Sequence, residues 1–230
     1  AIGDIDNDGY SIAPSNKSYS RTASKYAKHM RQDISWMPEE IRKINREPSI
    51  KNHNLRNHAD HIITRFRLYQ YLDGENLPPK ILNMSAQIEE DDEVKIKEIR
   101  KHINKCTIPA ISPDGTLLAS SLEELSILII TLQTKKHSQR PLKWEKPSPT
   151  IVSIADDFIH PFQPRTMTVR EMARFQSFPD NFEFRSKETT GSLRRRVEVP
   201  QYTQVGNAVP PILAEAVGKH IYSILKLFLK

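Results

Sequence analysis

A short run of residues near the C-terminus has the composition of an anion-binding helix start. Asn207 is a good N-cap residue, and Pro210 and Pro211 would then lie in the first helical turn, where a missing amide costs least. The amides of Ala208 and Val209 would remain as donors at the positive end of the helix dipole. This arrangement predicts a site for a carboxylate or a phosphate.

Apolar residues recur at helical spacing behind this run. Their period predicts a helix roughly 18–20 residues long with one apolar face, which must dock on a large partner surface. The residues of that face are Leu213, Val217, Ile221, Ile224, Leu225 and Phe228.

The sequence predicts a second helix start at Thr168. Thr168 and Glu171 have the spacing of a capping box, in which each side chain bonds the other residue's amide. The helix should stop by Phe178, because Pro179 disfavours helical geometry in the residue before it. Basic residues in and beside this helix pair with carboxylates or point at DNA, and spacing alone favours the structural role. They are Arg165, Arg170 and Arg174.

The sequence gives little support for a metal site or a nucleotide-phosphate loop. His53, His58, Asp60 and His61 lie close together, but nothing supplies a further ligand at firm spacing, so zinc is not expected. The single Cys106 cannot form an internal disulfide or a zinc knuckle. The seven glycines are too far apart to write a Gly-x-Gly-x-x-Gly turn or a P-loop.

The charge balance favours a polyanionic partner. Lys and Arg number 34 against 28 Asp and Glu, a formal charge of +6. Lys187 and residues 194–196, all arginine, flank Gly191 and predict a phosphate-gripping loop, the alternative being a solvated basic loop. Residues 135–146 hold five further basic residues around Trp144. They form either a loop against phosphates or an exposed basic loop with Trp144 tucked under it.

The elements that would position these residues make a mixed α/β chain with a modest core. Helical patterns run over 23–34, 55–72 and 89–105, a turn is written at 112–115, and β-branched runs predict strands at 127–132 and 150–154. No stretch has the length of a membrane span, and the acidic, polar start lacks the regions of a secretory signal. We expect a soluble intracellular protein.

Two ordered segments carry a family resemblance. The run from Arg165 to Phe182 (RTMTVREMARFQSFPDNF), followed by Gln204 to Ala214 (QVGNAVPPILA), closely resembles the last two signature motifs of the DNA (cytosine-5)-methyltransferases, motifs nine and ten. Weaker likeness extends to 143–151, to His160-Pro161 and to the opening 1–5, which is similar to the stretch after motif eight.

The resemblance implies a division of the chain. Residues 1–48 would connect from the catalytic core, and 49–199 would form a small mixed target-recognition domain that includes motif nine. Residues 200–230 would carry motif ten and return to a Rossmann-like S-adenosylmethionine domain whose N-terminal part is absent. The family's Pro-Cys, Glu-Asn-Val and Gly-rich motifs precede this segment. Cys106 stands in Lys-Cys-Thr, and Glu75-Asn76 lies ahead of it, the reverse of the family order, so we expect no catalytic residue here.

The resemblance also implies residue roles. Asn207 and Ala208 would line the S-adenosylmethionine pocket, which would be incomplete in this chain alone. The family's partners are double-stranded DNA and the N-terminal catalytic part, in the same chain or a separate subunit. The residues that would hold the recognition domain in place, with phosphate contact second, are Arg165, Thr168, Arg170, Glu171 and Arg174. The expected DNA-binding residues are Lys143, Lys187, Arg194, Arg195 and Arg196.

The resulting hypothesis is the C-terminal portion of a DNA (cytosine-5)-methyltransferase of a restriction-modification system. It would be inactive alone and associated with the nucleoid in the bacterial cytoplasm. The alternative is a stand-alone, sequence-specific DNA-binding specificity module. A nuclease is disfavoured, because Glu93-Val-Lys95 precedes Pro113-Asp114, the wrong order for that active site.

Overall fold

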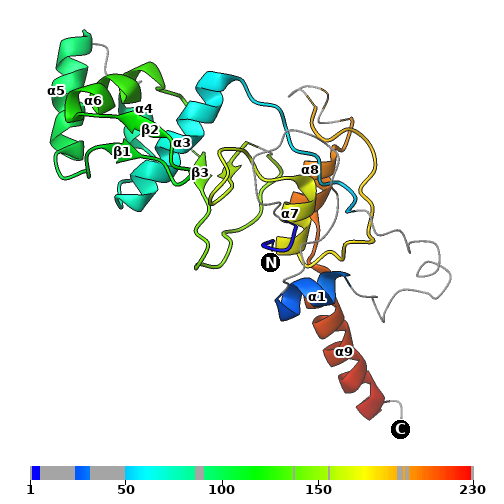
Figure 1. The fold of residues 1–230 in the computed structure, drawn as a ribbon. Coiled ribbons are helices and arrows are strands. Elements are labelled where there is room, and N and C mark those ends of the chain that lie inside the picture. Colours follow the sequence, from blue (N-terminus) through cyan, green and yellow to red (C-terminus); the bar gives the residue numbers. More distant parts are fainter. Residues whose placement is uncertain are drawn as a thin grey trace. The chain divides into compact units, whose positions relative to one another are not determined.

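The computed structural model describes residues 2–5, 24–31, 50–85, 91–136, 138–154, 156–190, 194 and 197–228 (Figure 1). The chain divides into two compact units. Unit 1 comprises Ala1–Leu55, Ser148–Ala155 and Thr168–Lys230, and unit 2 comprises Arg56–Pro147 and Asp156–Met167. The units interleave along the chain, whereas the expected functional segments were consecutive, and that functional division stays a prediction.

Four helices enclose the apolar core of unit 2. They are α3 (Asp60–Gly74), α4 (Ile81–Ser85), α5 (Asp92–Ile103) and α6 (Leu122–Thr131). Phe66, Leu72, Ile99, Leu125 and Ile129 are buried together in this core. The expected helices at 55–72 and 89–105 are thereby confirmed, the first with later bounds and the second shorter at both ends. Asp91 caps α5 by accepting a hydrogen bond from Val94 N at 3.1 Å, and acidic residues open this helix while basic residues close it.

A small hairpin joins α5 to α6. Strand β1 (Ala110–Ile111) pairs antiparallel with β2 (Leu117–Ala119), and Gly115 turns the chain with φ +83°. The Asp114 carboxylate accepts hydrogen bonds from Thr116 N at 3.1 Å and Arg67 Nε at 2.7 Å. The predicted turn at 112–115 is confirmed.

The predicted strand at 127–132 is wrong, because 127–131 belong to α6 and Leu132 is its C-cap residue. Ser121 caps that helix by accepting from Glu124 N at 3.2 Å, and Glu124 Oε2 accepts from Ser120 N at 2.6 Å. This capping pattern and the burial of Leu125 and Ile129 outweigh the strand preference of the β-branched run. Residues 150–154 also form no strand.

The second sheet of unit 2 is parallel. Strand β3 (Arg140–Pro141) pairs with β4 (Phe158–Ile159), and Ile159 bridges Thr166. Together with the helices, these short sheets confirm the mixed α/β class. None of the described helices is long and apolar enough to cross a membrane.

Helices dominate the described parts of unit 1. These are α1 (Lys25–Arg31), α7 (Val169–Phe175), α8 (Gln201–Asn207) and α9 (Pro211–Phe228). Helix α1 lies within the expected 23–34 span, and α7 begins with the predicted capping box. Helix α7 ends before Pro179, as predicted. Just after the helix, Ser177 adopts φ 58°, and its amide donates to Arg174 O at 3.0 Å. Helix α9 has the predicted length, with 18 residues.

Candidate functional site

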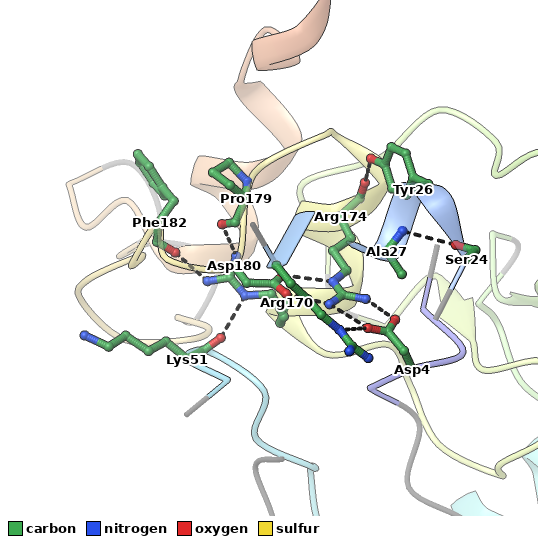
Figure 2. Close-up of polar contacts among 11 residues, drawn as sticks. Asp4, Ser24, Tyr26, Ala27, Lys51, Arg170, Arg174, Pro179, Asp180 and Phe182 are labelled. Atoms are coloured by element: carbon green, nitrogen blue, oxygen red, sulfur yellow. Dashed lines mark hydrogen bonds and ion pairs between the residues drawn. The ribbon is translucent and has the colours of Figure 1, made fainter. Parts of the chain in front are cut away.

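A buried ion cluster fixes α7 within unit 1 (Figure 2). Arg174 Nε donates to Asp180 Oδ1 at 2.9 Å, and Arg174 Nη2 donates to Asp4 Oδ2 at 3.2 Å. Arg31 Nε adds a second cation to Asp4 at 2.7 Å. Burial raises the pKa of the Asp4 carboxyl, but its bonds and charge attraction to Arg174 and Arg31 outweigh this, so its pKa lies below the usual range.

Arg170 ties two further segments of unit 1 to α7 through three main-chain acceptors. Its guanidinium donates to Lys51 O at 2.9 Å, to Pro179 O at 2.8 Å, and to Phe182 O (Figure 2). The side chains of Arg170 and Arg174 are fully buried, so neither offers a surface to a phosphate. This geometry supports the scaffold role predicted for both arginines.

The capping box of α7 is linked to a buried histidine. Thr168 N donates to Glu171 Oε2 at 2.7 Å, and Glu171 N donates to Thr168 Oγ1 at 3.3 Å. His53 Nδ1 and the Thr168 hydroxyl form a hydrogen bond of 2.8 Å. Arg165, the remaining predicted scaffold residue, lies in unit 2, where it is buried and donates to Gln163 Oε1 and to Thr166 O.

Asn52 is a connecting residue that sequence reasoning missed. It adopts φ 60°, and its side chain donates to Phe184 O at 2.8 Å and to Gln201 Oε1 at 3.1 Å. Its Oδ1 accepts from Phe184 N at 2.9 Å and its main-chain oxygen from Arg170 N at 2.9 Å. The available signal was an asparagine in an irregular segment, because Asn is enriched in the left-handed region. Asp4 and Asp180 were missed as well, since no spacing rule links them to Arg174.

The helix start expected at Asn207 is wrong. Asn207 is the last residue of α8, and α9 begins four residues later at Pro211. The amide of Ala208 donates to Val205 O at 3.3 Å, so the predicted pair of free amides is not formed. Only the second of the two prolines begins the next helix, and the chain uses Asn207 and Ala208 to turn between helices. The geometry therefore does not fit a cofactor carboxylate held by these two amides, although the Asn207 side chain is exposed at the turn.

Close backbone packing explains the glycine before Asn207. A Cβ built at Gly206 would lie 2.6 Å from Ser153 N and 2.7 Å from Val152 C. Only a residue without a side chain allows α8 to approach the 150–154 segment this closely. At the other side of the turn, Ile212 N donates to Ser177 Oγ at 3.2 Å, which joins the start of α9 to the end of α7.

Helix α9 carries an uncovered apolar face. No described residue of α9 is buried, and the helix runs away from α7 and α8 in Figure 1. The predicted stripe is confirmed and is exposed along its whole length. Its residues are Leu213, Val217, Ile221, Ile224, Leu225 and Phe228.

The predicted DNA-binding residues have different surroundings. Lys143 Nζ pairs with Asp73 at 3.0 Å in unit 2, and Lys187 Nζ lies 3.3 Å from Glu198 in unit 1. Arg194 is exposed, whereas residues 191–193, 195 and 196 lie outside the described part of the chain. Unit 1 contains 19 basic and 13 acidic residues and unit 2 contains 15 of each, so the whole formal charge of +6 belongs to unit 1.

Trp144 is not tucked under its basic loop. Its side chain is 45% exposed and lies against Phe162, with 5.2 Å between the ring centroids. The alternative of an exposed basic loop with Trp144 tucked under it is therefore wrong in its placement of Trp144. Lys143 and Lys146 are exposed on either side of it in the sequence.

Histidine and cysteine, the other residue types that could bind a metal or act as a nucleophile, are in surroundings that favour neither role. His58 contacts Phe66 edge-on, with 5.0 Å between ring centroids, and the described residues contain no group of three or more potential His, Cys, Asp or Glu metal ligands. Cys106 is half-buried, and burial together with the Glu75 carboxylate raises the pKa of its thiol. A raised pKa disfavours the thiolate form that acts as a nucleophile.

The sequence of this chain is similar to sequences of known proteins. A model described as C-5 cytosine-specific DNA methylase matches residues 10–223. The Type II methyltransferase M.DdeI of Desulfomicrobium norvegicum is 47% identical over 87 residues, which are 37% of this chain and 20% of that protein. M.AquIB of Picosynechococcus sp., also a Type II methyltransferase, is 50% identical over 84 residues, 36% of this chain and 60% of its own.

A longer alignment comes from an archaeal relative. The putative type II methyltransferase M.MJ0563P of Methanocaldococcus jannaschii is 31% identical over 157 residues, 67% of this chain and 46% of its own length. The chain thus spans between a fifth and three fifths of these relatives. Because the family model covers nearly all of the sequence, this chain belongs to the C-5 cytosine-specific DNA methylase family.

Proposed function

We propose that this chain supplies the target-recognition and closing portion of a DNA (cytosine-5)-methyltransferase. It engages double-stranded DNA and completes an S-adenosylmethionine site built mainly by the N-terminal catalytic part, and it does not methylate DNA without that part. The exposed apolar face of α9 carries the proposal, because an 18-residue helix with no buried residue needs a partner surface.

The anchoring of α9 suits a docking role. Its first turn is tied to Ser177 just after α7, and α7 is fixed by the ion cluster at Arg174 and by the main-chain contacts of Arg170. A rigid base presents the apolar face in one direction, which reduces the entropy lost when a partner binds. The catalytic part is the occupant we propose for this face.

The length of one relative supports an arrangement in two polypeptides. Since 84 residues make up 60% of M.AquIB, that protein is about 140 residues long, whereas M.DdeI is about 430. A Type II methyltransferase polypeptide can therefore consist mostly of the matched segment. The N-terminal part would then be either a separate subunit or a continuation of the same chain.

For the cofactor, we propose a contact through the Asn207 side chain. The turn between α8 and α9 presents this carboxamide to solvent, next to the helix that would dock on the catalytic part. Bound S-adenosylmethionine would supply the methyl group. Ala208 would line the pocket with its methyl group alone, since its amide is already bonded to Val205 O.

For DNA, we propose that the basic loop of unit 1 makes the main phosphate contacts. Lys187, Arg194, Arg195 and Arg196 belong to the unit that carries all of the net charge. Lys143, like Lys187, must exchange an ion pair for a phosphate, and it lies in the unit without net charge, so its effect should be smaller. A restriction-modification setting, in the nucleoid of a bacterial cytoplasm, completes the proposal.

Reconstitution tests this function. The chain is mixed with a protein that carries the family's Pro-Cys and Glu-Asn-Val motifs, and transfer of labelled methyl groups to DNA is measured. We expect incorporation with both proteins and none with either alone. Ile221→Glu, which places a charge on the apolar face, should abolish it, whereas Glu215→Gln in the same helix serves as the matched control. Incorporation by this chain alone would overturn the proposal, and DNA binding with no complementation would favour a stand-alone specificity module.

A further inference from the structure

An aromatic pair stands on the surface of unit 2 where two loops meet. Trp144 follows β3 and Phe162 follows β4, and the parallel pairing of these strands brings their following loops to the same edge. Leu142 N donates to Ile159 O at 2.9 Å and continues the pairing up to the aromatic residues. The rings lie 5.2 Å apart between centroids at 53°, and the side chains are 45% and 50% exposed.

Buried polar residues hold the Phe162 loop in shape. The imidazole of His160, which has no exposed surface, accepts from Phe162 N at 3.3 Å and from Gln163 N at 3.0 Å through Nδ1. Gln70 on α3 is also buried, and its Nε2 donates to His160 O at 2.7 Å and to Gln163 O at 3.0 Å. Two bonds accepted by His160 and two donated by Gln70 therefore fix this loop, and the Phe162 ring at its tip is half exposed.

A fixed loop that exposes two large rings is suited to contact with another molecule, because burial of those rings would be favourable. Basic residues mark the chemistry of that molecule. Lys143 and Lys146 flank Trp144 and are exposed, Arg140 precedes them, and Glu145 is the acidic residue among them. Exposed aromatic rings beside cations suit a nucleic acid, which offers flat bases along an anionic backbone.

We propose that Trp144 and Phe162 form a stacking contact for a DNA base. The inference rests on the proposed function, since it takes DNA as the partner, and it deepens that function by assigning unit 2 a contact that does not depend on net charge. Because a ring stacks best on a base that has lost one neighbour, the pair should favour DNA with an unpaired base over a continuous duplex.

Tryptophan fluorescence gives a direct test. The sequence contains two tryptophans, so Trp36→Phe leaves Trp144 as the single reporter. The full chain with this change is titrated with a mixed-sequence 30-nucleotide duplex and with the same duplex containing one unpaired base. We expect Trp144 emission to be quenched by both, with about threefold tighter binding to the DNA that has the unpaired base.

Substitution of Phe162 separates stacking from simple apolar contact. Phe162→Leu keeps apolar bulk but removes the ring, and both it and Phe162→Ala should weaken binding about tenfold. Phe162→Tyr should bind as the parent does. Leu117→Ala, which trims an exposed apolar residue elsewhere in unit 2, should leave affinity unchanged. Circular dichroism confirms that each variant is folded.

The outcomes distinguish this inference from the proposed function. If the chain binds DNA with normal salt dependence while Trp144 emission and the Phe162→Leu affinity stay unchanged, the stacking contact is overturned and the proposed function stands. If the Phe162 variants bind DNA normally but lose methyl transfer in reconstitution, the pair contacts protein and the inference is again overturned. If the folded chain binds neither DNA, both the inference and DNA engagement by this chain fail.

Discussion

The interiors of unit 1 and unit 2 differ in composition. Unit 2 has an apolar core drawn from four helices and a hairpin, and its charges balance. Unit 1 is organised around buried arginines and their acceptors, carries the whole net charge, and exposes the apolar face of α9. The difference indicates that unit 2 packs its helices around one apolar core, whereas unit 1 leaves the apolar face of its longest helix, α9, exposed.

The largest expected effect breaks the polar organisation of unit 1. Arg174→Ala leaves Asp4 and Asp180 buried without their shared cation, and should lower the free energy of unfolding by about 3–5 kcal/mol. Urea unfolding followed by amide exchange should show the loss in unit 1 while unit 2 keeps its protection. Equal loss in both units would contradict the comparison. Arg67→Ala, at an ion pair in unit 2 that is partly exposed, is the control and should cost far less.

Close packing inside unit 1 gives the next effect. Gly206→Ala places a methyl group against the backbone of 152–153 and should cost about 2 kcal/mol, because backbone cannot move aside cheaply. Gly218 offers a matched control in α9, where a Cβ meets no atom within 4 Å. Gly218→Ala should stabilise that helix by up to about 1 kcal/mol. Thermal unfolding of both variants measures the contrast, and a neutral Gly206→Ala would show that α8 is not packed as described.

Acid sensitivity should be present in both units but from different groups. Burial raises the pKa of Asp114 in unit 2, but hydrogen bonds from Ser112, Arg67 and Thr116 lower it to about 2. Because this folded pKa lies below the model-peptide value of 3.8, the carboxylate stabilises the fold above pH 4, and that stability is lost as the pH falls toward 2.

Asp114→Asn should therefore be less stable than the parent above pH 4, and the gap should close toward pH 2. Urea midpoints measured across this range give the answer. The Asp4 carboxylate in unit 1 acts in the same direction, since its pKa is also lowered. A gap that widens toward low pH would reject the sign of the shift at Asp114.

The smallest expected effect is on DNA binding, and it tests the difference in net charge between the two units. Arg195→Ala should weaken binding almost uniformly across sequences and lower the slope of log K against log salt by about one unit. Lys143→Ala should change the slope less, because that ammonium group is already paired with Asp73 in unit 2. Filter binding over a series of salt concentrations measures both. Equal slopes for the parent and Arg195→Ala would exclude a phosphate contact by this residue.

Local rules predicted much of this molecule. The capping box at Thr168, the turn at Gly115 and the period of α9 were readable because each depends on a few neighbouring residues. The strand expected at 127–132 was wrong, since a capping pattern at Ser121 and Glu124 placed those residues in a helix.

The candidate site was less predictable, because its bonds join distant parts of the chain. The Arg174 cation meets an aspartate 170 residues away, and Asn52 bonds a residue 149 positions later. Asn207 was misplaced for another reason. Its type and the two prolines suit a helix start, but Pro211 alone begins α9 and Asn207 ends the helix before it.

The route of the chain through residues 148–155 constrains engineering. This stretch belongs to unit 1, yet it lies between the two segments that build unit 2, and it supplies the backbone against which Gly206 packs. A swap of unit 2 between relatives therefore needs four junctions rather than two. A transplant of 56–167 as one block would also replace the backbone against which Gly206 packs, so we expect the chimera to lose stability whatever unit 2 binds.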